Sequence, residues 1–149
     1  MVLKALESET FEPLSQKSLK FVTYKTIFLT AIITFRRCSD LQSLRIDQES
    51  MRIRGLSKQD RQNHFGIKIH VPYFPERILL DPKRALSIYL EKTKNCREKL
   101  SALEKAKHFF STVTISNWIV QTIGTAYSDD MLKVNAHSTS EIAPSWALL

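Results

Sequence analysis

Residues 17–35 read KSLKFVTYKTIFLTAIITF, and this stretch sets the expectation for the whole fold. Apolar side chains cover most of the circumference that a helix would present here, which predicts a largely buried helix. Its most apolar part, residues 27–35, lies between Lys25 and Arg36 and has roughly half the length needed to span a bilayer. We therefore expect the core helix of a folded domain rather than a membrane segment.

Two further helices are predicted downstream. Asp81 followed by Pro82 is a typical helix start, with an acidic N-cap and proline at the first helical position, and this helix should run to about Thr93. The next helix should be capped by Thr114 or Ser116. Its apolar positions follow the spacing of one helical face: Ile115, Trp118, Ile119, Thr122, Ile123 and Ala126.

Between these helices the pattern changes to that of strands. Residues 50–54 are a candidate strand, and residues 67–71 (IKIHV) alternate apolar and polar side chains, which is typical of a half-buried strand. The polar residues between them read as a turn, and Pro72 and Pro75 end the second strand. The sequence therefore predicts an α+β fold that is mainly α, a helical bundle with a small antiparallel sheet near its middle.

The length of 149 residues fits a single domain. Residues 1–16 are polar and lack a period, so we expect a flexible lead-in followed by a folded domain over residues 17–149. Lys and Arg number 22 against 15 Asp and Glu, a formal charge of +7. Such an excess suits a polyanionic partner, usually nucleic acid, although a solvated basic surface explains it equally well.

The two cysteines, Cys38 and Cys96, belong to no CxxC pair and have no suitably spaced histidine nearby. We read them as free thiols in a reducing compartment, with Cys38 buried. His64 and His70 flank a strand, but no third ligand is spaced to join them, so neither a metal nor another cofactor is expected. The first twenty residues have no signal-peptide pattern, and secretion is not expected.

One short segment places an arginine pair where the first helix ends. Residues 34–44 read TFRRCSDLQSL, in which Ser39 and Asp40 look like the cap of a second, short helix. The order of arginine, serine, acid and leucine resembles the first arginine box of the tyrosine recombinases, the phage-integrase family. The resemblance implies that Arg37 is the catalytic arginine and that Arg36 faces DNA or solvent.

A second segment, residues 136–148 (AHSTSEIAPSWAL), resembles the histidine–arginine box of the same family. It is similar above all to the recombinases of DIRS-like retrotransposons. His137 matches the box histidine, whereas Ser140 stands where the second arginine is expected. Between the boxes, residues 81–90 and 114–119 resemble two helix segments of that group, in the same order. The resemblance covers about residue 15 to the end of the sequence.

The resemblance implies DNA recombination and integration within a mobile element, in the nucleus or cytoplasm. In that chemistry a tyrosine attacks a backbone phosphate and forms a covalent phosphotyrosine. Two arginines bind the non-bridging oxygens, and a lysine in a β-hairpin serves as general acid. Mapped onto this chain, Arg37 is the phosphate clamp, His137 is the acid–base or phosphate-contacting histidine, and Lys58 is the hairpin lysine. Double-stranded DNA is the expected partner, contacted by Arg36, Arg61, Lys68, Lys83 and Arg84.

The departures from the family decide what activity we expect. Serine is neutral and short, so Ser140 cannot chelate phosphate as an arginine does. The four tyrosines all precede His137, and none occupies the place of the family's nucleophile. We therefore expect a partial, degenerate catalytic domain that lacks the family's C-terminal helices and does not cleave DNA. Two alternatives stay open: a non-catalytic DNA-binding module, or a helical protein-interaction module that self-associates through an exposed surface.

Overall fold

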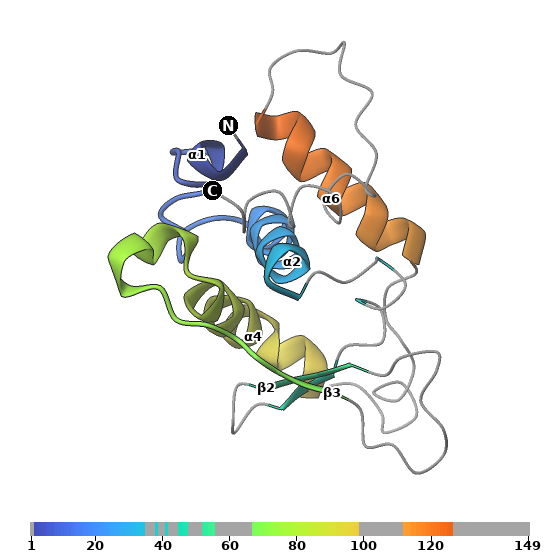
Figure 1. The fold of residues 1–149 in the computed structure, drawn as a ribbon. Helices are drawn as coiled ribbons and strands as arrows, with labels where there is room; N and C mark the ends of the chain where they lie inside the picture. The colour runs from blue at the N-terminus through green and yellow to red at the C-terminus, as the bar shows by residue number, and fades with distance from the viewer. Residues whose placement is uncertain are drawn as a thin grey trace.

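A computed structural model describes residues 2–34, 38, 41, 45–47, 52–55, 67–98 and 112–126. In this part of the chain the fold is mainly helical, as the sequence predicts. The helices are α1 (Val2–Leu6), α2 (Leu19–Thr34), α4 (Pro82–Glu98) and α6 (Thr112–Ala126), and a 3-10 helix, η1 (Pro75–Leu80), precedes α4. The centre is α2, which packs against both α4 and α6 (Figure 1).

The predicted core helix is confirmed with slightly narrower bounds, Leu19–Thr34 instead of 17–35. Two threonine hydroxyls join it to its neighbours. Thr26 Oγ1 donates to the carbonyl oxygen of Ala85 in α4 at 3.2 Å. Thr122 Oγ1 in α6 shares its hydrogen between the carbonyl oxygen of Trp118, at 2.7 Å, and that of Tyr24 in α2, at 3.3 Å. These bonds satisfy hydroxyl groups inside the helix contacts, so α2 is held on two sides by polar as well as apolar contacts.

Local sequence signals predict the start of one of the other two long helices correctly and the start of the other incorrectly. The start of α4 is as predicted: Pro82 is its first residue, and Asp81 Oδ1 accepts the backbone N–H of Lys83 at 3.0 Å. The helix continues to Glu98, five residues beyond the expected end at Thr93. By contrast, α6 begins at Thr112, so the caps expected at Thr114 and Ser116 are wrong. Both residues lie inside the first turns of α6.

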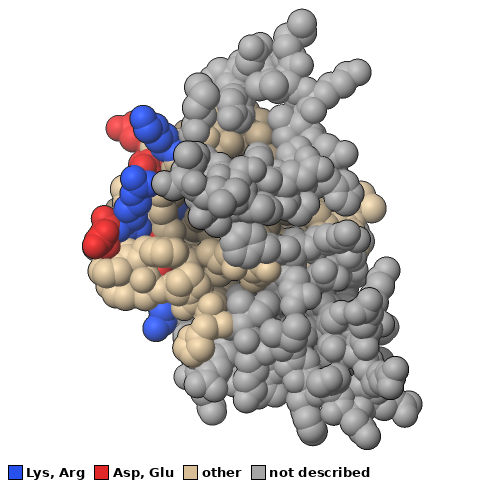
Figure 2. Space-filling view, in the orientation of Figure 1, with Lys and Arg blue, Asp and Glu red and all other residues tan. Residues whose placement is uncertain are grey.

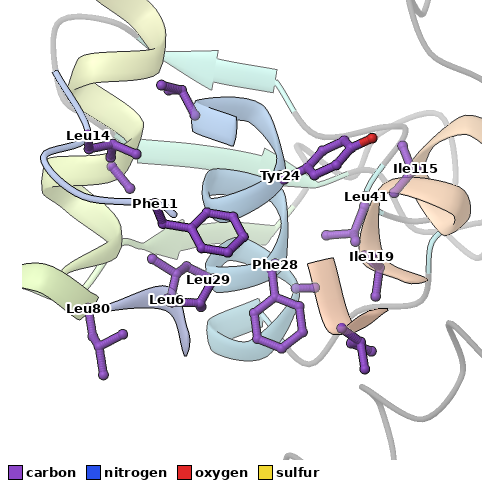
Figure 3. Close-up of a cluster of buried hydrophobic side chains, with 14 of the residues drawn as sticks. Leu6, Phe11, Leu14, Tyr24, Phe28, Leu29, Leu41, Leu80, Ile115 and Ile119 are labelled. Carbon is purple, nitrogen blue, oxygen red and sulfur yellow. The ribbon is translucent and has the colours of Figure 1, made fainter. Parts of the chain in front are cut away.

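The core joins all the long helices with the N-terminal segment (Figure 3). Ile115 and Ile119 contribute from α6, with Leu41 beside them, and Phe28 and Leu29 contribute from α2. Tyr89 and Trp118 pack against this cluster as partly buried residues. Within the described residues, no helix combines the length and apolar character that crossing a membrane requires.

The expectation of a flexible lead-in over residues 1–16 is wrong. Leu6, Phe11 and Leu14 are fully buried, and the ring of Phe11 meets that of Phe21 in α2 edge-on, with 5.7 Å between centroids. The segment is α1 followed by turns, in which the N–H of Phe11 donates to the carbonyl of Ser8 at 3.0 Å. Its apolar residues follow neither the helical nor the strand period, so a search for periodicity misses them.

Three short strands, β1 (Arg45–Asp47), β2 (Arg52–Gly55) and β3 (Ile67–His70), pair antiparallel in the order β1-β2-β3. In the register, Arg45 faces Arg54 across the first pair, and Arg54 faces Lys68 across the second. The sequence did not predict β1. Val71, expected in the last strand, follows β3 and is buried.

Candidate nucleic-acid interface

Most of the residues that the family resemblance assigns to catalysis lie outside the described part of the chain. This holds for Arg37, Lys58, His137 and Ser140, and also for the expected DNA contacts Arg36 and Arg61. Their roles therefore stay predictions. The remaining expected contacts fall into two places: Lys68 lies in β3, and Lys83 and Arg84 lie in the first turn of α4.

Positions on the small sheet are arranged so that basic residues share one face. Residues directly opposite each other on paired strands lie on the same side of a sheet. Arg45, Arg54 and Lys68 are opposite one another in turn, and we call them the cationic row. Like charges directly opposite each other are destabilising unless a counter-charge relieves them.

The next row of the sheet is mixed. Asp47 is opposite Arg52, and Arg52 is opposite His70. Because successive residues of a strand alternate between faces, this row shares its face with the cationic row. The opposite face carries Ile46, Ile53 and Ile69 in one line. The register thus aligns basic positions with one another in one row and isoleucine positions with one another in the next, which the sequence shows only once the pairing of the strands is known.

Arg84, expected to contact DNA, instead binds a carboxylate inside the protein. Its Nη1 and Nη2 donate to Oε1 and Oε2 of Glu12, each at 2.9 Å, in a bidentate ion pair. The side chain of Arg84 is 27% exposed and that of Glu12 is 10% exposed. The pairing raises the pKa of Arg84, and burial opposes that rise in part. We correct the expectation accordingly: Arg84 serves as a structural cation.

The carboxylate of Glu12 also binds a second cation, Lys25. In the sequence, this residue stands out only because it precedes an apolar stretch. Lys25 is fully buried, and its Nζ donates to Glu12 Oε1 and to the carbonyl oxygen of Leu6, both at 2.5 Å. The backbone N–H of Leu14 also donates to Glu12, at 2.9 Å. Glu12, Lys25 and Arg84 form what we call the buried triad, which joins the N-terminal segment to α2 and α4.

Burial and pairing act in opposite directions on the titration of the triad. Burial alone would raise the pKa of Glu12, but the hydrogen bonds from Arg84, Lys25 and Leu14 and the charge of Lys25 outweigh it and lower the pKa from 4.5 to about 2. For Lys25 burial dominates and lowers the pKa, although Glu12 works against this change. Glu12 therefore stays ionised throughout the neutral range.

Lys83, one residue before Arg84, has a different environment. Its side chain is exposed, and it lines an open hollow of about 300 Å³ together with Tyr73, Asp81, Arg84 and Ser87. On the face that Figure 2 shows, Lys and Arg side chains of the described residues alternate with Asp and Glu. Lys83 is thus available to an external anion, whereas Arg84 already has a partner.

The expectation that Cys38 is buried is confirmed. Burial raises the pKa of its thiol, and a hydrogen bond with Ser116 in α6 opposes that rise. In the part of the chain that the structure describes, no three His, Cys, Asp or Glu residues are grouped to hold a metal ion. No family model, curated protein or solved structure matches this chain.

Proposed function

We propose that this chain is a DNA-binding domain related to tyrosine recombinases, and that it binds the backbone phosphates of double-stranded DNA through the basic face of its small sheet. The observation that carries the proposal is the cationic row, Arg45, Arg54 and Lys68, in which three cations are opposite one another on adjacent strands. Adjacent strands are about 4.8 Å apart, so a ladder of this kind concentrates positive charge over a short distance.

The chemistry of DNA suits this arrangement. A duplex carries a dense line of phosphates, and each phosphate neutralised by Lys or Arg releases a condensed counterion. A short antiparallel ribbon also fits the major groove, which admits two strands side by side. Both the overall charge of +7 and the exposed Lys83 support the same partner. Within the family resemblance, a lysine on a β-hairpin meets DNA, and the sheet offers such a hairpin in β2 and β3.

The proposal extends to the reaction. The family resemblance implies that Arg37 and His137 would contact the phosphate. With Ser140 in the position of the second arginine, one clamp on the phosphate is missing. Loss of such a group costs roughly 3 kcal/mol or more in the transition state. We therefore propose that the chain binds DNA without cutting it.

Fluorescence anisotropy with a labelled duplex, measured over a range of salt concentrations, tests the binding. The triple variant Arg45→Gln, Arg54→Gln, Lys68→Gln should bind about a hundredfold more weakly near 0.1 M salt. The slope of log K against log salt should fall by about three. The matched control is Lys4→Gln, Lys17→Gln, Lys20→Gln, which removes the same charge from the N-terminal segment and α2.

If both triple variants lose affinity equally, binding follows net charge and the sheet is not the interface. If the unmodified protein shows no salt-dependent binding, DNA is not the partner. The same complexes, formed on a nicked duplex and then denatured, report on cleavage. We expect no protein to stay attached to DNA, and a denaturation-resistant adduct would contradict the proposed lack of cleavage.

A further inference from the structure

Exposed apolar side chains concentrate in one short segment between β3 and α4. The described part of the chain has six large hydrophobic residues with high exposure: Leu19, Tyr73, Phe74, Ile78, Leu79 and Val113. Four of the six fall within Tyr73–Leu79. Tyr73 is 62% exposed and Phe74 is 45% exposed. A cluster of this kind indicates a contact surface, because isolated exposed apolar residues are ordinary but clusters are not.

The surroundings of Tyr73 indicate the chemistry of the partner. Tyr73 lines the open hollow next to the exposed Lys83, with Ser87 and the carboxylate of Asp81 also in its wall. An aromatic ring beside a cation matches a nucleotide, whose base stacks on the ring while its phosphate meets the cation. The hydroxyl of Ser87, which is exposed, suits the edge of a base.

The position of the segment along the chain adds a second argument. It follows β3 directly in the chain, and Tyr73 comes three residues after His70, the last residue of that strand. Both rings are too exposed to serve the core, and the ring of Tyr73 lines the hollow together with Lys83.

We propose that Tyr73 and Phe74 form a stacking site for unpaired nucleic-acid bases, with Lys83 contacting the adjoining phosphate. This inference rests on the proposed function and adds a preference to it. DNA with single-stranded or gapped segments should bind more tightly than fully paired duplex of the same length. The base would be held by stacking on the rings, so the site should tolerate many sequences.

The test uses a single-stranded oligonucleotide that carries 2-aminopurine, whose fluorescence is quenched when the base stacks. The full chain should quench it, and the variant Tyr73→Leu, Phe74→Leu should not. That variant should also bind single strands about five- to a hundredfold more weakly. Its affinity for paired duplex should stay within about twofold, because the cationic row is intact.

The matched control is Ile78→Ala, Leu79→Ala, which removes apolar surface from the same segment without removing a ring. It should leave quenching and single-strand affinity unchanged. If the aromatic variant binds single strands as well as the unmodified protein does, the stacking site is wrong even though duplex binding stands. Should both variants instead abolish self-association in sedimentation without changing nucleic-acid affinity, the segment docks protein and the inference is overturned. Failure of duplex binding itself would count against the proposed function first.

Discussion

The buried triad and the cationic row both bring basic residues together, but only the triad includes an acidic residue. In the triad, two cations converge on one carboxylate, and every formal charge has a partner within 3 Å. In the row, Arg45, Arg54 and Lys68 are opposite one another with no acid among them. The first arrangement is complete without a ligand, whereas we propose that the second binds the phosphates of DNA. A count of basic residues therefore says little about binding until their partners are known.

The largest effect should come from breaking the triad at its shared carboxylate. Glu12→Ala leaves Lys25 buried with a single carbonyl oxygen as its partner, and an uncompensated buried charge is costly. We expect the free energy of unfolding to fall by about 3–5 kcal/mol, measured by urea denaturation. Glu9→Ala, at an exposed position of the same segment, is the control and should change it by less than about 0.5 kcal/mol. Equal effects of both changes would mean that the triad does not stabilise the fold.

A second effect of nearly the same size should appear in acid. The pKa of Glu12 is 4.5 when unperturbed and about 2 in the folded protein, so the unfolded chain binds more protons between these values. Its contribution is fully present above about pH 4.5 and is lost as the pH falls toward 2. The loss amounts to about 3 kcal/mol. Denaturation midpoints measured across this window should show it.

Glu12→Gln provides the comparison for the acid experiment, because glutamine keeps the shape of the side chain but does not titrate there. Other carboxylates contribute to acid unfolding in both proteins, so only the difference between the two curves reports on Glu12. That difference should shrink as the pH falls from 4.5 to 2. A constant difference across the window would show that the carboxylate is not held ionised by Lys25 and Arg84.

The smallest effect on stability should come from the cationic row. The variant Arg45→Gln, Arg54→Gln, Lys68→Gln removes like charges from paired positions of the sheet. The free energy of unfolding should change by no more than about 0.5 kcal/mol, with any change toward greater stability. The measurement is urea denaturation in the absence of DNA. A large loss of stability would place the row among the structural charges and remove the contrast with the triad.

The parts of the fold that the sequence predicted are those with local causes. The start of α4 depends on Asp81 and Pro82, which are adjacent, and the body of α2 depends on its own apolar residues. The N-terminal segment was misjudged because Leu6, Phe11 and Leu14 are buried by contacts with distant elements and follow no period. The start of α6 was placed too late because two hydroxyl residues within the helix looked like caps.

The candidate site was predicted even less completely, for the same reason. From the sequence alone, the neighbours Lys83 and Arg84 are equally good candidates for a DNA contact. Only the ion pair of Arg84 with Glu12 distinguishes them. The partner of Lys25 lies 13 residues away in a segment without regular structure. That Arg45 is opposite Arg54 follows only from the register of the strands, which depends on pairing between separate segments. One signal was present: Lys25 lies among the buried positions of a predicted core helix, where a charged residue requires a partner.

The two cations of the triad differ in their separation from Glu12 along the sequence. Lys25 is 13 residues away, and Arg84 is 72 residues away. The entropy lost in closing a loop grows with its length, so Lys25 can meet the carboxylate at smaller cost than Arg84. During folding the first pair can therefore form while α1 and α2 dock, and the second must wait until α4 arrives. Through a single carboxylate, the N-terminal segment is thus tied both to a residue near it in the sequence and to one far from it.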